Sequence, residues 1–184
     1  MSPQPVIREA VDGSRQLSMM RWGLVPAWAK EGDGMINARC EMVNVKPTFR
    51  QRRCIIPASG FYEWLRVEGK KVPYYIRMAD GSPMPFAGIW AAWHSPERQV
   101  LETFAILTST ANPTVSPIHE RMPGILPPEA FKLWLDRQVQ KADRLMGLLA
   151  PCPADRFAAY RVSTSVNSPA NDKAECLLSP QVKR

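Results

Sequence analysis

The sequence predicts an α+β fold, in which many short, mostly antiparallel strands are accompanied by a few helices. Eighteen prolines are spread over the 184 residues and divide the chain into short elements. The dipeptides Glu68-Gly69 and Asp80-Gly81 are turn signals between apolar runs. Apolar residues make up 45% of the chain, which is too many for disorder, and the length suits one domain with an adequate core.

Strands are expected where β-branched and aromatic residues lie between turn signals. The two turn dipeptides connect the central strands as an antiparallel meander. In chain order, the expected strands span residues 18–25, 53–57, 60–67, 72–78, 85–92, 101–109 and 158–163.

Helices are expected over residues 40–52, 127–136 and 138–149. The second begins at Pro127 and Pro128, because proline is favoured in the first turn of a helix. Its apolar residues fall on one face at helical spacing, and so do those of the third helix; these are Phe131, Trp134 and Leu135, then Val139, Leu145, Leu148 and Leu149.

The net charge of +7 and the pI of about 9.5 favour an anionic partner, most commonly nucleic acid. A basic cluster lies within eight residues, although a solvated face explains such a run equally well. Trp22 and Trp28 lie on either side of Pro26 and suit stacking on unpaired bases, with core packing as the alternative. The basic cluster consists of Lys46, Arg50, Arg52 and Arg53.

Cysteine usage indicates a reduced, cytoplasmic protein without structural disulfides. The four cysteines, at positions 40, 54, 152 and 176, form no C-x-x-C pair, and there are only two histidines. A zinc site is therefore not expected, and Cys54 is interpreted as a small core residue. We also expect no membrane span, since no apolar run reaches about 18 residues, and no secretory signal.

Residues 118–123 (Ile-His-Glu-Arg-Met-Pro) contain His119, next to Glu120 and Arg121 and just after an expected core strand. Histidine is the side chain best suited to moving protons near neutral pH. Taken alone, this segment favours a simpler interpretation, in which the histidine only satisfies a hydrogen bond in a loop.

Two further segments carry polar groups suited to a site. In the expected strand 60–67, Phe61, Glu63 and Leu65 share one face. A carboxylate between aromatic residues is partly desolvated, which raises its pKa and suits acid–base chemistry; the alternative is a solvated or arginine-paired glutamate. In residues 36–39 (Ile-Asn-Ala-Arg), Asn37 can donate and accept, and Arg39 has a planar fork suited to phosphate.

Together, in this order, these segments resemble the SOS-response-associated peptidase (SRAP) family of abasic-site proteins. The resemblance extends over most of the chain. It includes residues 20–29 (Met-Arg-Trp-Gly-Leu-Val-Pro-Ala-Trp-Ala), 36–39, 46–49 (Lys-Pro-Thr-Phe), 53–64, 87–90 (Ala-Gly-Ile-Trp), 118–123, 162–167 and 171–172.

The resemblance implies a curved, barrel-like and mostly antiparallel β core flanked by helices, in one domain over residues 1–184. It also implies a chemistry, in which an N-terminal cysteine attacks the sugar aldehyde of an abasic site in single-stranded DNA and forms a thiazolidine link. Asn37 would position the reacting groups, Glu63 would relay protons, and His119 would act on the sugar oxygen. The DNA contacts would come from Arg21, Trp22, Arg39, Arg53 and Arg121. No metal or other cofactor is implied, and the expected form is a cytoplasmic monomer that joins the nucleoid on DNA damage.

The amino terminus departs from the family pattern. Family members begin Met-Cys-Gly-Arg, whereas this chain begins Met-Ser-Pro-Gln-Pro-Val-Ile-Arg, which resembles a later family block. We expect that a segment of several tens of residues is missing upstream, because the start codon was placed too late or the chain was shortened. The alternative is a truncated, degenerate gene. The codons upstream of Met1 distinguish these cases. As written, the chain is expected to bind single-stranded DNA without a stable crosslink.

Two other functions are compatible with the sequence. A thiol autopeptidase would pair a cysteine, with Cys54 as the nearest candidate, with His119. A non-catalytic nucleic-acid binder would need only the basic cluster and the tryptophans. Glu63, His119 and Asn37 argue against the second, since phosphate binding does not require a desolvated carboxylate.

Overall fold

The computed structural model describes residues 2–29, 34–43, 47–95 and 99–180, which form two compact units, each built from three separate chain segments. The barrel unit comprises Met1–Pro57, Pro85–Ser109 and Pro123–Pro151. The hairpin unit comprises Ala58–Met84, Thr110–Met122 and Cys152–Arg184. Each unit therefore brings together residues that lie far apart in the sequence.

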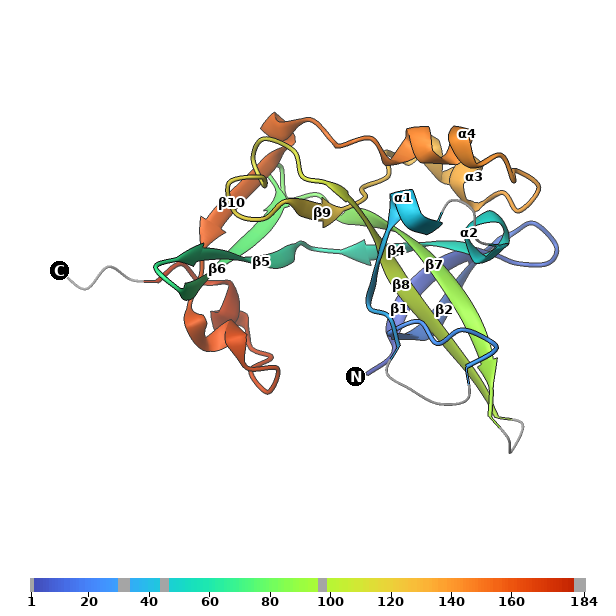
Figure 1. Ribbon diagram of the computed structural model, residues 1–184, viewed down its shortest axis with the longest axis horizontal. Coiled ribbons are helices and arrows are strands. Elements are labelled where there is room, and N and C mark those ends of the chain that lie inside the picture. Colours follow the sequence, from blue (N-terminus) through green and yellow to red (C-terminus); the bar gives the residue numbers. More distant parts are fainter. Residues whose placement is uncertain (1, 30–33, 44–46, 96–98, 181–184) are drawn as a thin grey trace. The chain divides into compact units, whose positions relative to one another are not determined.

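The barrel unit contains a closed, mixed β-barrel (Figure 1). Its strands are neighbours in the order β2-β1-β4-β7-β8, and a parallel pairing between β2 and β8 closes the ring. A further strand, β3, runs parallel to β8. The bounds are β1 Gln4–Glu9, β2 Arg15–Trp22, β3 Asn37–Arg39, β4 Arg53–Ala58, β7 Met84–His94 and β8 Val100–Thr110.

A small residue allows the barrel to pack closely. A Cβ on Gly88 would lie 2.3 Å from the Ile56 side chain and 3.0 Å from the Cys54 sulfur, so a larger residue does not fit there without a shift.

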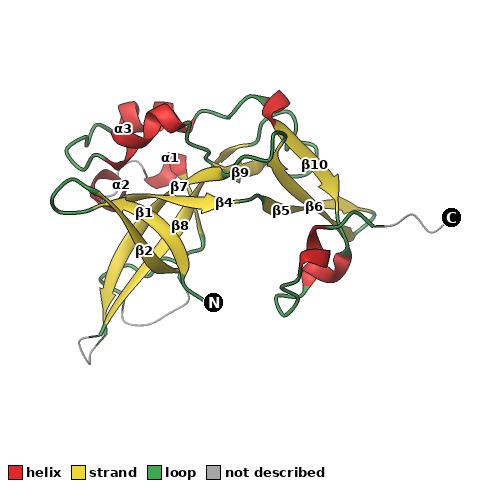
Figure 2. Ribbon diagram, turned by 180° about the vertical axis from the view of Figure 1, so that it is seen from behind, coloured by secondary structure: helices red, strands yellow, loops and turns green. Residues whose placement is uncertain are grey.

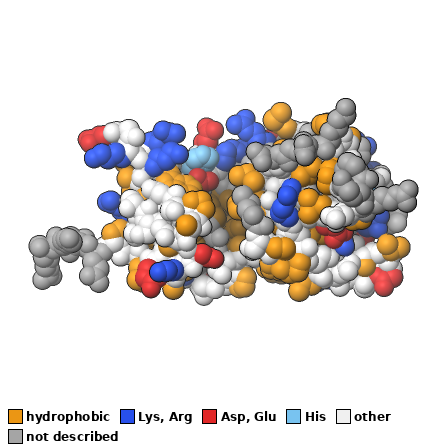
Figure 3. All heavy atoms as spheres, turned by 90° about the horizontal axis from the view of Figure 1, so that it is seen from below, with side chains coloured by type: hydrophobic (Ala, Val, Ile, Leu, Met, Phe, Trp, Pro, Cys, Tyr) orange, Lys and Arg blue, Asp and Glu red, His pale blue; other side chains and the backbone are white. Residues whose placement is uncertain are grey.

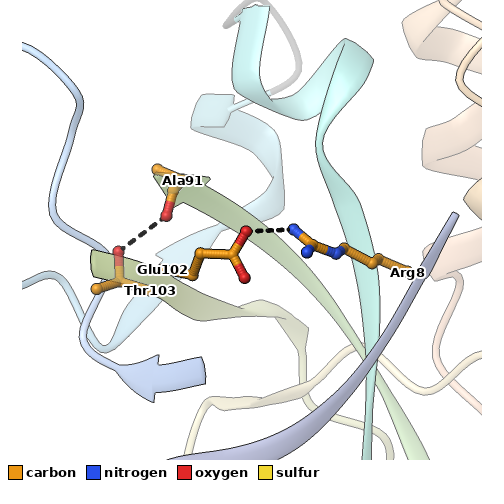
Figure 4. A network of polar contacts seen from close by, with 4 residues as sticks. All are labelled: Arg8, Ala91, Glu102 and Thr103. Atoms are coloured by element: carbon orange, nitrogen blue, oxygen red, sulfur yellow. Dashed lines mark hydrogen bonds and ion pairs between the residues drawn. The ribbon is translucent and has the colours of Figure 1, made fainter. Parts of the chain in front are cut away.

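A polar network ties β1 to β8 (Figure 4). The Arg8 guanidinium donates to Glu102 over 2.6 Å and lies 4.4 Å from the Trp90 ring centroid. Thr103, which is fully buried, donates to the Ala91 carbonyl and accepts from the Val25 N–H. The buried Thr103 hydroxyl is therefore paired as both donor and acceptor, as burial requires.

Short helices cover one side of the barrel (Figure 2). Trp134 on α3 is fully buried, packs edge-on against Phe49 at 5.9 Å and donates from its indole nitrogen to the Cys54 carbonyl. This anchors the helices to β4. The helical segments are α1 Cys40–Val43, α2 Pro47–Gln51, η1 Pro128–Ala130, α3 Phe131–Leu135, α4 Ala142–Met146 and η2 Gly147–Leu149.

The hairpin unit is built on an antiparallel sheet in the order β10-β6-β5. Its strands are β5 Phe61–Val67, β6 Lys70–Met78 and β10 Phe157–Arg161. Glu68 (φ 48°) and Gly69 (φ 77°) join β5 to β6 with two positive φ angles, as a two-residue hairpin turn of type I′ requires. The unit also contains η3 Ala154–Arg156, η4 Thr164–Asn167 and η5 Ala174–Leu177, and the chain leaves it through β9 Arg121–Pro123.

One face of this sheet carries a row of tyrosines. Tyr62, Tyr75 and Tyr160 lie opposite one another in the registers, with ring centroids 5.2 and 5.8 Å apart. The Tyr160 hydroxyl donates to the Leu177 carbonyl, and the Trp64 indole donates to Asn167. The segment after β10 is thereby fixed to this face, and the opposite face is the one that carries Glu63.

The predicted fold class is confirmed, and every predicted strand is present with shifted ends. The predicted antiparallel meander is wrong in one respect, because β6 and β7 do not pair with each other. β6 pairs with β5 and β10, whereas β7 pairs with β8 in the other sheet. The turn at Asp80-Gly81 therefore connects two sheets. The predicted helix 40–52 is present as two short helices, 40–43 and 47–51, with residues 44–46 outside the described residues.

Candidate functional site: an acid–base pair and a separate polar strand

Glu63 and His119 face each other in the hairpin unit. The His119 Nδ1 lies 3.7 Å from the Glu63 Oε1, and the side chains are 42% and 24% exposed. Burial raises the pKa of the Glu63 carboxyl, while His119 and the Trp64 backbone N–H, which favour the charged form, limit the rise. Near neutral pH, a larger fraction of this carboxyl is therefore protonated than in an ordinary glutamic acid, and it can act as a proton donor. The strand position of Glu63 predicted this raised pKa.

Backbone groups of the loop before β9 hold the His119 ring. The Arg121 N–H donates to His119 Nδ1 over 3.1 Å, which leaves the proton of the neutral ring on Nε2. The same Nδ1 lies 3.1 Å from the Arg121 carbonyl, an acceptor when the ring is charged. The Arg121 backbone therefore contacts the ring at Nδ1.

Asn112 fixes the start of this loop. Its side-chain oxygen accepts from the Thr114 and Val115 N–H groups, and its amide donates to the Cys152 carbonyl. The His119 N–H in turn donates to the Val115 carbonyl. Asn112 is 2% exposed, so it serves the structure of the loop, a role that we did not assign from the sequence.

The surface around a histidine is charged. In Figure 3, acidic side chains lie directly beside a histidine and basic side chains lie close by. In the sequence, Arg121 follows His119 by two residues and is half-buried. The hairpin unit therefore brings together three of the predicted site residues, Glu63, His119 and Arg121.

The other polar residues belong to the barrel unit. Asn37 and Arg39 are exposed on β3, on either side of the buried Ala38, so both side chains project from the solvent face. Gly23 and Gly34 allow the chain to pass close by at this point, because a Cβ on Gly34 would lie 2.0 Å from the Gly23 oxygen. Asn37 belongs to the barrel unit, whereas the Glu63–His119 pair belongs to the hairpin unit.

Trp22 and Trp28 differ in exposure. Trp22 is half-buried, and its indole donates to the Ile36 carbonyl next to Asn37. Trp28 is 85% exposed, and Trp93 fixes its loop by donating to the Ala29 carbonyl. Of the two tryptophans that suit stacking, Trp28 therefore has the more accessible ring, although only Trp22 was expected to contact DNA. The position of Trp28 next to Pro26-Ala27, in a loop-like stretch, was the sequence signal for its exposure. Arg21, beside Trp22, is half-buried.

The structure corrects the role of Arg53. Its side chain is buried, and its guanidinium donates to carbonyls of α2 and of the α3 region. Burial lowers its pKa to about 10, so it stays charged at neutral pH. Arg53 therefore joins internal segments through hydrogen bonds and does not reach DNA phosphate. Lys46, another residue of the predicted basic cluster, lies outside the described residues. The carbonyls that accept hydrogen bonds from the Arg53 guanidinium belong to Phe49, Arg50, Trp134, Asp136 and Val139.

None of the cysteines in residues 2–180 has the features of a nucleophile. Cys54 is fully buried in the barrel, and burial raises the pKa of its thiol well above the usual range. Burial also raises the pKa of the Cys152 thiol. Because the thiolate is the reactive form, Cys54 does not support the thiol peptidase mechanism considered from the sequence.

The described residues contain no group of three or more His, Cys, Asp or Glu side chains that could hold a metal ion. Within the same residues, no helix is both long and apolar enough to cross a membrane.

Comparisons with known proteins identify the family of the chain. The model of the SOS response associated peptidase (SRAP) family matches residues 1–169. A Bacillus subtilis protein named abasic site processing protein YoqW is 44% identical, over 91% of this chain and 79% of its own length. The chicken protein named abasic site processing protein HMCES is 35% identical, over 97% and 62%. A crystal structure of a Bacteroides thetaiotaomicron protein has a TM-score of 0.85 at 27% identity, covering 97% of this chain and 81% of that one.

Proposed function

Since the chain belongs to the SOS response associated peptidase (SRAP) family, we propose that it acts on abasic sites in single-stranded DNA. Relatives in bacteria and vertebrates are named abasic site processing proteins, which supports abasic-site processing as the activity of the family. The observation on which the proposal depends is the pairing of a partly desolvated glutamate with a histidine, Glu63 and His119.

The Glu63–His119 pair suits the chemistry of a sugar aldehyde. A ring-closed abasic sugar must open before its aldehyde can react, and His119 would donate a proton to the ring oxygen from Nε2. An amine that adds to the aldehyde gives a carbinolamine, which loses water to form an imine. Glu63 would supply the proton for the departing water, which a carboxyl with a raised pKa does readily.

The covalent step in the family, as the resemblance implies, uses an N-terminal cysteine. Its α-amine has a pKa of about 7.7–8.0 and is partly neutral in the cell. After imine formation the thiol adds to the imine carbon, and the five-membered thiazolidine closes with the net loss of one water. The cysteines at positions 40, 54, 152 and 176 each have their nitrogen in a peptide bond, so none of them can close a thiazolidine, which supports the proposal that residues 1–184 bind abasic DNA without a stable covalent link of their own.

Each unit offers groups that would contact DNA, Arg39 and the tryptophans on the barrel unit and Arg121 on the hairpin unit. Arg39 and Arg121 would contact phosphates flanking the lesion, and Asn37 would position the reacting sugar or amine. The exposed ring of Trp28, and the edge of Trp22, would stack on unpaired bases. The net charge of +7 supports an anionic ligand.

Two measurements test the proposal. In a binding assay, the chain should prefer a single-stranded oligonucleotide with one abasic site over the same strand without it. On a denaturing gel, the mixture should show no shifted band. Equal affinity for the two strands would argue against abasic-site recognition, and a shifted band would show that residues 1–184 contain a nucleophile of their own.

A further inference from the structure

A row of three side chains crosses the sheet of the hairpin unit, beginning at Glu63. In the antiparallel registers, Glu63 on β5 lies opposite Tyr74 on β6, and Tyr74 lies opposite Arg161 on β10. Residues directly opposite each other project from the same face, with Cβ atoms about 4.5–5.5 Å apart. Tyr74 and Arg161 therefore stand on the face from which Glu63 contacts His119.

The row lies where this face opens to solvent. On one side of it, Ile76, opposite Phe61, is fully buried. On the other side, Leu65 is half-buried and Val67 is 44% exposed. Within the row, exposure increases from the half-buried Tyr74 to the exposed Arg161. The row therefore runs from the half-buried Glu63 and Tyr74 to solvent at Arg161.

The chemistry of the row suits a nucleotide. An aromatic ring packs against a base or a deoxyribose, and a guanidinium binds phosphate with two parallel hydrogen bonds. Among the described residues, no acidic side chain forms an ion pair with Arg161. Arg161 stands two interstrand spacings from Glu63, about 9–10 Å, so a phosphate at Arg161 would belong to a neighbouring nucleotide and not to the sugar at Glu63.

We propose that Tyr74 and Arg161 bind the nucleotide next to the abasic site, with the Tyr74 ring against its base or sugar and Arg161 on its phosphate. This inference rests on the proposed function and adds a binding position beside the acid–base pair.

The first test compares two arginines of one sheet. Arg161→Gln removes a charge from the Glu63 face, and Arg66→Gln removes an equal charge from an exposed position of β5 on the opposite face. Binding to an oligonucleotide with one tetrahydrofuran abasic analogue is measured at several salt concentrations. Arg161→Gln should weaken binding about tenfold and make the salt slope shallower by about 0.7, and Arg66→Gln should change neither.

The second test concerns the ring and the neighbouring nucleotide. Tyr74→Phe keeps the ring and should keep the affinity, whereas Tyr74→Thr, which retains strand preference, should lose about fivefold or more. The analogue can also be placed at either end of the oligonucleotide, which leaves a neighbouring nucleotide on one side only. At the end that lacks the nucleotide contacted by Arg161, the effect of Arg161→Gln should disappear. Melting temperatures of the variants show whether each one is folded.

The outcomes separate the two proposals. If the wild-type chain does not bind the abasic oligonucleotide, the proposed function fails and this inference fails with it. If the wild-type chain binds, but Arg161→Gln and Arg66→Gln lose affinity equally or Tyr74→Phe loses as much as Tyr74→Thr, only the assignment of the row is overturned.

Discussion

At the level of single residues, a carboxyl and an imidazole of one unit lie 3.7 Å apart. Burial raises the pKa of Glu63, and the charge of His119 opposes the rise. The Arg121 backbone N–H and carbonyl oxygen both lie 3.1 Å from the His119 Nδ1. This arrangement costs folding stability whenever Glu63 is ionised, because the folded state solvates the carboxylate less well than the unfolded state does.

Glu63→Gln should therefore be at least as stable as the wild type at pH 7. A carboxyl with a raised pKa in the folded state contributes most to stability below its unfolded pKa, and the contribution is lost as pH rises through the folded value. The advantage of the variant should shrink as pH falls toward 4.5, the ordinary glutamate value. Thermal melting from pH 4 to 8 measures this difference; a variant that is less stable at pH 7 and equal at pH 4 would reverse the predicted sign.

At the level of elements, Arg53 shows how a strand and the helices beside it are locked together. Its guanidinium reaches α2 and the α3 region from the first position of β4, so it satisfies carbonyls that would otherwise be buried without a partner. The neighbouring Arg50 is exposed on α2. Two arginines of one basic cluster thus have different roles.

Arg53→Met should destabilise the fold by about 3 kcal/mol or more, because several buried acceptors lose a charged donor at once. Arg50→Gln removes the same charge from an exposed site and should change stability by less than about 0.5 kcal/mol. Urea denaturation of both variants compares them. Similar small losses would show that the cross-link contributes little.

The elements also show what the sequence can predict. Alternation along residues 61–67 correctly separated the Glu63 face from the Tyr62 face, since that pattern is local. The parallel pairing of β2 with β8 and the separation of β6 from β7 into two sheets depend on distant segments, so no local pattern indicates them. The burial of Arg53 was missed for a similar reason, because its acceptors on α3 and beyond lie more than 80 residues away.

At the level of the whole molecule, the net charge of +7 should make DNA binding depend on salt. If Arg39, Arg121 and Arg161 each contact one phosphate of a single strand, a plot of log affinity against log salt should have a slope of about −2. Titrations between low and physiological salt give this slope, and removing Arg39 should make it shallower by about 0.7. A slope near zero would show that phosphate contacts do not contribute.

The central claim is that Glu63 and His119 perform acid–base chemistry on the abasic sugar, and it can be tested with the nucleophile supplied separately. A short peptide beginning Cys-Gly-Arg is mixed with a single-stranded abasic oligonucleotide, with and without the chain, and the thiazolidine adduct is quantified over time by mass spectrometry. The wild-type chain and the Arg66→Gln control should accelerate adduct formation, and Glu63→Gln and His119→Ala should each lower that acceleration by about 10²-fold or abolish it. Equal rates with and without the chain, or variants as fast as the wild type, would contradict the claim.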